Sequence, residues 1–204
     1  MKLKVCGMKY QDNILKVAAL KPDYMGFIFY DKSPRYVSGA IPDLPDSIKT
    51  VGVFVNDDVE TVLDTVRKYK LDVVQLHGEE SLEFCQTLQD NAIEIIKVFS
   101  IKDTFDFTQL LPFEPFIDYF LFDTKGTNPG GNGYRFDWNI LKHYNSDIPY
   151  FLSGGIGIDH MEALNQFKSS PFSTYCHALD VNSKFELKPA HKDDLKLKQF
   201  INIL

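Results

Sequence analysis

Two residues with possible roles in proton transfer stand where short apolar segments end. Cys6 follows the apolar segment 3–5, and Asp123 follows the apolar segment 119–122. A thiol can act as a nucleophile or a base if its pKa falls from about 8.5 toward the working pH. A buried carboxyl group with a raised pKa can donate a proton. Simpler roles are open to both: a buried hydrophobe for Cys6, and a helix cap or a partner of Lys125 for Asp123.

Further polar residues at segment ends could hold an anionic ligand. The Arg35 guanidinium could bind a carboxylate through two hydrogen bonds, although an isolated arginine is more often a surface residue. The segment 153–155, Ser-Gly-Gly, precedes a predicted helix, where free N–H groups favour a phosphate; alternatively, its glycines only form a tight turn. Ser183 could close the other side of such a phosphate site. His77 could contact a substrate or be a structural, hydrogen-bonded residue.

Strand-like segments alternate with helix-like segments along the whole chain. Several of the strand-like segments are continuously apolar, which is typical of parallel strands covered on both faces. The predicted strands are 3–5, 24–29, 50–55, 73–76, 93–98, 119–122, 149–152 and 174–179. The predicted helices are 12–20, 58–69, 81–88, 137–144, 158–167 and 193–203.

Eight strand–helix units predict one (β/α)8 TIM barrel domain over residues 1–204, with an eight-stranded parallel sheet. An open doubly wound sheet is the competing architecture, but it normally has fewer strands. Segments 38–47 and 103–115 each contain two prolines, which predicts short or irregular helices after strands 2 and 5. In a barrel, the loops after the strands carry the function, so the polar residues named above would meet at one end.

The composition excludes several classes of protein. Hydrophobic residues make up 44% and charged residues 25%, and the net charge of -6 without a basic tract argues against nucleic-acid binding. No apolar segment approaches the roughly 20 residues of a membrane helix, and the N-terminus lacks a signal-peptide pattern. The cysteines and histidines form neither a disulfide nor a metal pattern, so we expect a cytoplasmic protein without a metal. Cys85 and Cys176 are predicted core residues.

Nine motifs, in order and over nearly the whole chain, resemble the phosphoribosylanthranilate isomerase family. The motifs lie at residues 4–7, 26–29, 33–37, 51–56, 74–78, 122–124, 136–138, 153–155 and 179–183. Three positions depart from the family pattern: Asn132 replaces a threonine, and Lys184 and Ala190 replace glycines. Lys184 adjoins the predicted phosphate loop, where it could add a cation or alter a backbone that requires a positive φ.

The resemblance implies an Amadori rearrangement in L-tryptophan biosynthesis. N-(5-phosphoribosyl)anthranilate would become 1-(2-carboxyphenylamino)-1-deoxyribulose 5-phosphate, with Asp123 as general acid at the ring oxygen and Cys6 as general base at C2. Arg35 would bind the anthranilate carboxylate, and the glycines after strand seven would bind the phosphate. The substrate-binding residues that the resemblance implies are Arg35, His77, Gly154, Gly155, Asp180 and Ser183. The reaction needs no cofactor, and we expect a monomer or homodimer.

Two other functions remain open for a barrel with a phosphate site. Another sugar-phosphate isomerase or epimerase would commonly use paired carboxylates and would not require both Cys6 and Asp123. A non-catalytic barrel that binds a phosphorylated metabolite is the second alternative, with Lys184 and Ala190 as signs of drift. Loss of the substrate's anthranilate fluorescence on adding the protein would distinguish the three functions.

Overall fold

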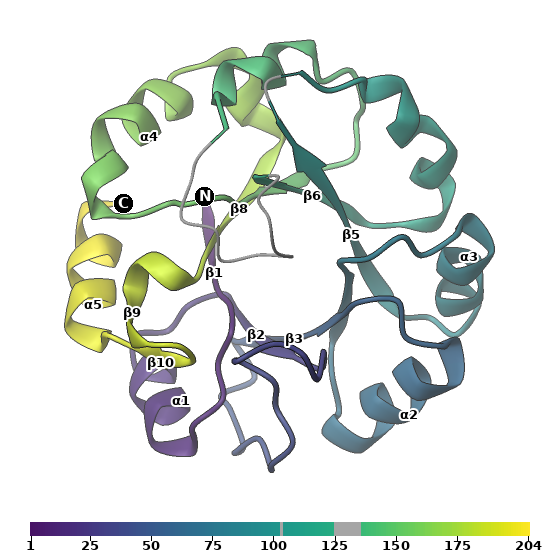
Figure 1. The fold of residues 1–204 in the computed structure, drawn as a ribbon. Coiled ribbons are helices and arrows are strands. Elements are labelled where there is room, and N and C mark those ends of the chain that lie inside the picture. Colours follow the sequence, from purple (N-terminus) through teal and green to yellow (C-terminus); the bar gives the residue numbers. More distant parts are fainter. Residues whose placement is uncertain (103, 125–135) are drawn as a thin grey trace.

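Eight parallel strands close into a barrel in the computed structural model, which describes residues 1–102, 104–124 and 136–204. In Figure 1 the helices lie outside the ring of strands. Each strand pairs with the next in the sequence, and β8 pairs with β1. The strands are β1 Lys2–Val5, β2 Tyr24–Ile28, β3 Lys49–Phe54, β4 Val73–Leu76, β5 Glu94–Ile101, β6 Tyr119–Thr124, β7 Tyr150–Leu152 and β8 Cys176–Val181. The predicted fold is confirmed.

Side-chain caps fix the start of several outer helices. Asp58 accepts a hydrogen bond from the Thr61 backbone N–H (2.9 Å), and Ser81 accepts one from that of Phe84 (3.2 Å). Such caps satisfy N–H groups that have no partner within the first turn. The α-helices are α1 Gln11–Ala18, α2 Val59–Tyr69, α3 Leu82–Asp90, α4 Met161–Lys168 and α5 Asp194–Ile203. None of the helices in the described segments is long and apolar enough to cross a membrane.

The segments that contain prolines form irregular structure, as predicted. No helix follows β2, and a 3₁₀ helix, η1 Phe107–Phe116, follows β5 and contains Pro112 and Pro115. Proline has no N–H and cannot continue an α-helical hydrogen-bond ladder. Other short connections are also 3₁₀ helices: η2 Trp138–His143, η3 Ile158–His160, η4 Pro171–Tyr175 and η5 Ser183–Phe185. The predicted helix 137–144 is therefore a 3₁₀ helix.

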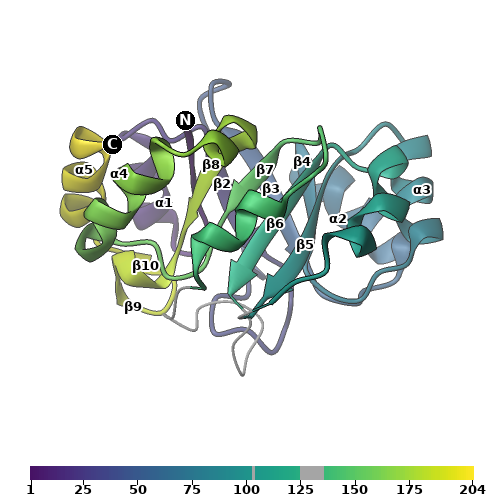
Figure 2. The same cartoon turned by 90° about the horizontal axis from the view of Figure 1, so that it is seen from above.

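An antiparallel pair of short strands after β8 was not predicted. It consists of β9 Glu186–Lys188 and β10 His191–Lys192. Figure 2 shows the pair beside the carboxyl end of β8, at the end of the barrel toward which the arrowheads of β5 and β6 point. The pair is too short to show a strand periodicity, but it brings two charged residues to this end of the barrel.

Apolar side chains fill the amino-terminal part of the barrel interior. They come from the seven strands β2 to β8: Tyr24, Val51, Val73, Ile96, Val98, Leu121, Phe151 and Ala178. A filled interior is a core and not a channel, so ligands are confined to the opposite end. At that end the buried interior positions become polar, with Lys4, Gln75, Asp123 and Asp180.

Gly26 allows β1 and β2 to approach closely beside Cys6. A Cβ at position 26 would lie 2.7 Å from the Cys6 Sγ and 3.1 Å from the Cys6 Cα. By contrast, a Cβ at Gly39 would meet no atom within 4 Å. The glycine at position 26 is therefore required for packing.

Gly26→Ala is expected to lower the free energy of unfolding by about 1–3 kcal/mol, the usual cost of overpacking, because the end of β1 must move. Denaturant titration measures this change. Gly39→Ala is the matched control and should stay within about 0.5 kcal/mol of the original protein. Equal stabilities of the two variants would contradict the packing argument.

Candidate functional site

The eight site residues predicted from the sequence line one pocket at the carboxyl end of the barrel. They lie in the last residues of six strands or in the loops that follow them: Cys6, Arg35, His77, Asp123, Gly154, Gly155, Asp180 and Ser183. Cys6 follows β1, whereas Asp123 is the second-to-last residue of β6 and not, as predicted, the residue after the strand; these strands are not neighbours in the barrel. A thiol and a carboxyl group can therefore face a ligand in this pocket from different sides.

Cys6 continues the end of β1 and is held there by its backbone. Its N–H donates to the Val181 carbonyl of β8 (2.9 Å), and its side chain is buried. Burial raises the pKa of the Cys6 thiol, while the ammonium groups of Lys4 and Lys192 act in the opposite direction. The raised pKa means that Cys6 is a neutral thiol in the unbound protein at neutral pH.

Lys4 is a fully buried cation on β1, two residues before Cys6. Its Nζ donates to Gln75 Oε1 (2.6 Å) and to Asp180 Oδ1 (3.0 Å). Burial alone would lower the pKa of Lys4, but Asp180 and Cys6 hold that pKa above its usual value. Lys4 had no role predicted from the sequence. Its spacing of two residues from Cys6 was the available signal, because residues i and i+2 of a strand share a face.

Gln75 links Lys4 to the His77 and Asp123 side of the pocket. An ammonium group only donates, so the Gln75 amide oxygen must face Lys4 and its NH₂ must face His77 Nδ1, 3.3 Å away. Nδ1 is then an acceptor, so the proton of a neutral imidazole lies on Nε2. This atom is 3.6 Å from Asp123 Oδ2. The buried chain of contacts therefore fixes the orientation of the His77 ring beside the carboxyl group of Asp123.

Asp123 is buried and also bonded to its own strand end. Its Oδ1 accepts a hydrogen bond from the Thr124 N–H (2.9 Å), and its other oxygen faces His77. The proposed alternative partner, Lys125, lies outside the described residues, as does the glycine-rich segment 126–135 with Asn132. Within the described part of the chain, Asp123 thus presents a carboxyl group to the pocket with one oxygen already hydrogen-bonded.

A glycine turn after β7 forms the part of the pocket where the sequence predicted a phosphate. Gly154 and Gly155 have φ values of 91° and 70°, which favour glycine. A Cβ at Gly154 would lie 2.1 Å from Thr124 Oγ1, so this turn packs directly on the end of β6. The turn leads into the short η3 before α4 begins, rather than directly into an α-helix as predicted.

Two departures from the family pattern have different structural consequences. Lys184 lies in η5 and has no positive φ, so the lysine does not strain the loop; its side chain packs over Gly157 and lines the pocket. Ala190 does have a positive φ, 66°, and is buried. The backbone strain that the sequence suggested at Lys184 therefore occurs at Ala190 instead.

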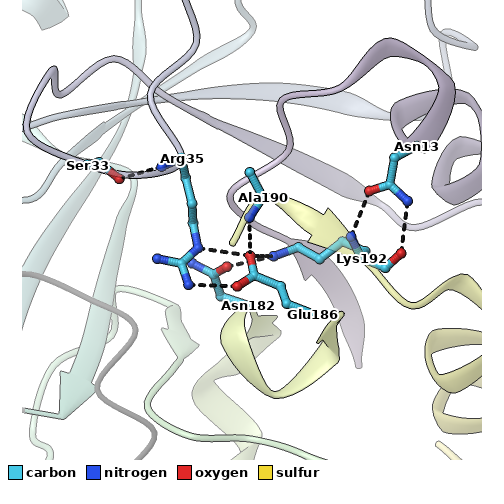
Figure 3. A network of polar contacts seen from close by, with 7 residues as sticks. All are labelled: Asn13, Ser33, Arg35, Asn182, Glu186, Ala190 and Lys192. Atoms are coloured by element: carbon cyan, nitrogen blue, oxygen red, sulfur yellow. Dashed lines mark hydrogen bonds and ion pairs between the residues drawn. The ribbon is translucent and has the colours of Figure 1, made fainter. Parts of the chain in front are cut away.

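Arg35 is bound by a network that reaches the β9–β10 pair (Figure 3). Its Nε and Nη2 donate to the two carboxylate oxygens of Glu186 (2.8 and 2.7 Å). Lys192 Nζ donates to Glu186 Oε1 (2.7 Å) and Asn182 Oδ1 (2.6 Å). The Asn13 side-chain amide donates to the Lys192 carbonyl and accepts from the Lys192 backbone N–H. Arg35 is therefore a fixed, largely buried residue at the edge of the pocket and not a free surface side chain.

The network holds two cations and one carboxylate in a buried environment. Burial lowers the pKa of Lys192 to about 8, despite its ion pair with Glu186. Burial alone would raise the pKa of Glu186, but Arg35 and Lys192 hold that pKa below its ordinary value. Glu186 and Lys192 had no role predicted from the sequence, since a charged residue near a proline turn usually lies on the surface.

Comparisons with family models, related sequences and solved structures all find the same family. The sequence model of the family described as "N-(5'phosphoribosyl)anthranilate (PRA) isomerase" matches residues 3–203. The N-(5'-phosphoribosyl)anthranilate isomerase of Parabacteroides distasonis is 44% identical, over 98% of this chain and 92% of its own length.

Solved structures of phosphoribosyl anthranilate isomerases superimpose on nearly the whole chain. The phosphoribosyl anthranilate isomerase of Thermotoga maritima is 32% identical with a TM-score of 0.84, covering 100% of this chain and 98% of its own. A phosphoribosyl anthranilate isomerase in complex with reduced 1-(o-carboxyphenylamino)-1-deoxyribulose 5-phosphate is 30% identical with a TM-score of 0.79. It covers 99% of this chain and 97% of its own.

The buried thiols predict slow reaction with disulfide reagents in the native protein. Burial raises the pKa of Cys6 above its ordinary value, that of Cys85 to about 11 and that of Cys176 to about 12. Since only the thiolate reacts, raised pKa values leave little reactive form at pH 8. Dithionitrobenzoate at pH 8 should therefore react much faster after unfolding in guanidinium than before it. One thiol per chain that reacts in the native state at the rate of free cysteine would contradict this prediction.

Proposed function

The chain belongs to the N-(5'-phosphoribosyl)anthranilate isomerase family, and on that premise we propose that Cys6 and Asp123 perform the proton transfers of its reaction. The family's enzymes are aldose–ketose isomerases of tryptophan biosynthesis. The observation that most supports the proposal is the position of Cys6 and Asp123 on non-adjacent strands around one pocket. The substrate of this chain is then N-(5-phosphoribosyl)anthranilate.

Asp123 is the general acid that opens the sugar ring. It protonates the furanose oxygen as the bond between that oxygen and C1 breaks, which leaves a Schiff base between C1 and the anthranilate nitrogen. Support comes from its buried carboxyl group, whose Oδ2 lies toward the pocket beside His77. A positioned acid typically contributes about 10²–10⁴-fold to the rate.

Cys6 is the general base that completes the isomerisation. Its thiolate removes the proton from C2, and the electron pair of that bond moves to form the enolamine. Tautomerisation of the enolamine, with protonation at C1, gives the ketose. No covalent bond between Cys6 and the substrate is required in this sequence of steps.

The raised pKa of the Cys6 thiol constrains this role, because a base must first be deprotonated. Lys4 and Lys192 are the two ammonium groups that oppose the effect of burial on this pKa. Opposite charges nearby favour the thiolate form. We therefore assign them the stabilisation of the thiolate during the reaction, with the rate limited by the thiolate fraction in the bound complex.

The two ends of the substrate are bound on different sides of the reacting centre. The phosphate binds the Gly154–Gly155 turn and Ser183, with Lys184 as an additional cation at the rim, and the anthranilate carboxylate binds Arg35. Support comes from the positive φ values of the turn and from the guanidinium at the pocket edge. Holding both ends places the ribose between acid and base. His77 and Asp180 line the pocket between these ends and contact the sugar.

A reducing compartment, the cytoplasm, is the proposed location of the enzyme. Support comes from the three cysteines, which are all free and buried in the structure. Proteins of oxidising compartments, by contrast, commonly rely on disulfides.

Loss of anthranilate fluorescence after adding N-(5-phosphoribosyl)anthranilate tests the reaction and the role of Cys6. Cys6→Ala should lower kcat by about 10²–10⁴-fold with the fold intact, because the base is removed. For the original protein, kcat/KM should keep rising with pH beyond the ordinary pKa of a free thiol, because burial holds the pKa of Cys6 above that value and deprotonation produces the base.

Cys85→Ala is the matched control for removal of a buried thiol. Cys85 is in the core and does not line the pocket, so kcat should stay within a few-fold of the original value. A Cys6→Ala variant with near-normal kcat would remove the thiol from the mechanism. No fluorescence change with the original protein would instead refute the proposed reaction.

Arg35→Ala should raise KM by about 10- to 100-fold and change kcat by only a few-fold, because a charge-assisted hydrogen bond to the carboxylate is lost from the bound substrate. Steady-state kinetics by the same fluorescence assay separate the two constants. If kcat fell while KM stayed constant, Arg35 would have a role in the chemical step and not in binding the carboxylate.

A further inference from the structure

Glu186 is the centre of the buried network at the edge of the pocket (Figure 3). Its carboxylate accepts four hydrogen bonds: two from Arg35, one from Lys192 Nζ and one from the Ala190 backbone N–H (3.1 Å). The side chain of Glu186 is only 5% exposed. A carboxylate with four donors and almost no exposure is committed to the protein and does not bind a ligand itself.

The contacts with Glu186 leave one edge of the Arg35 guanidinium unused. Arginine has five N–H donors and two edges that can each bind a carboxylate through parallel hydrogen bonds. Glu186 occupies the edge formed by Nε and Nη2. The terminal edge, formed by Nη1 and Nη2, is the edge left for a second carboxylate, and Arg35 lines the pocket.

The network also controls the charge at this edge of the pocket. Arg35 and Lys192 are two cations that share the single carboxylate of Glu186. The group as a whole carries one positive charge, which a carboxylate of the ligand would neutralise. Without Glu186 the two cations would repel each other in a buried environment, and Arg35 would lose the contacts that hold its orientation.

The position of Arg35 is tied to the end of β1 by close packing. A Cβ at Gly7 would lie 2.6 Å from Arg35 Cδ and 2.8 Å from Asn182 Oδ1. The backbone N–H of Arg35 also donates to Ser33 Oγ (3.1 Å). The backbone, the side-chain stem and the guanidinium of Arg35 are therefore each fixed by a contact. The stem packs against Gly7, the residue after the proposed base Cys6.

We propose that Glu186 is a positioning residue that directs the terminal edge of the Arg35 guanidinium toward the carboxylate of the substrate, an inference that rests on the proposed function. Glu186 thereby determines specificity for a carboxylated aromatic amine without touching it. Lys192 supports this arrangement by binding the same carboxylate and Asn182.

Two probes separate this role from general support of the fold. One is reduced 1-(o-carboxyphenylamino)-1-deoxyribulose 5-phosphate, and the other is the same compound without its carboxyl group. Glu186→Gln should weaken binding of the carboxylated probe by about 10- to 100-fold, as expected when a charge-assisted contact is disturbed. Binding of the carboxyl-free probe should stay within about twofold of that of the original protein. Isothermal titration calorimetry measures both dissociation constants.

Two further variants serve as controls. Glu94→Gln removes the partner of Lys49 (2.5 Å) at the first residue of β5, at the opposite end of the barrel, and should leave both probes unaffected. Glu186→Asp keeps the charge but shortens the side chain, so it should weaken the carboxylated probe selectively and by less than Glu186→Gln. If Glu186→Gln does not fold, as judged by circular dichroism, Glu186→Asp decides the question.

Equal weakening of the two probes by the Glu186 variants, or no weakening of either, would overturn this inference. Arg35→Ala distinguishes that failure from a failure of the proposed function. If Arg35→Ala weakens the carboxylated probe selectively and the Glu186 variants do not, Arg35 binds the carboxylate without help from Glu186. If Arg35→Ala also has no selective effect, the carboxylate site of the proposed function is itself wrong.

Discussion

The arrangement of the pocket depends on the buried ammonium group of Lys4. A charge taken out of water is costly unless it is paired, and breaking one partner from such a pair commonly costs about 3–5 kcal/mol. Lys4 is completely buried and has two partners, Asp180 of β8 and Gln75 of β4. The two hydrogen bonds of Lys4 join β1 to β4 and to β8, two residues before Cys6. Through Gln75 they also set the orientation of His77.

A second buried cation, Lys192, also acts on the Cys6 thiol. Lys192 is held by Glu186 and Asn182, and it opposes the effect of burial on the pKa of Cys6, as Lys4 does. Cys6 is thus surrounded by positive charge that is largely, but not completely, compensated by carboxylates. Such surroundings keep a buried thiol neutral at rest and still lower the energy of its thiolate. Burial disfavours the thiolate, so the proposed proton transfer would depend on these two ammonium groups to lower its energy.

The β9–β10 pair lies outside the barrel and supplies charged residues to the network at the edge of the pocket. It supplies Glu186 and Lys192, and the Ala190 N–H between them donates to Glu186. Ala190 adopts this position with a φ of 66°, a conformation that is costly for a residue with a Cβ. The contact with the carboxylate of Glu186 is one of the interactions that hold the strained backbone in place. The same carboxylate also binds the Arg35 guanidinium.

The sequence by itself determined the barrel, because strand-like segments alternate with helix-like segments along the chain, and side chains such as Asp58, Ser81 and Asp193 cap some of the outer helices. It also predicted which residues lie near strand ends, although Asp123 and Asp180 were expected after strands and instead lie within β6 and β8. Only the tertiary structure decided the partners of these residues. Lys4 meets Asp180 at a sequence separation of 176 residues, and Arg35 meets Glu186 at a separation of 151. Such contacts are set by closure of the barrel and by burial of charge, which no local pattern of residues encodes.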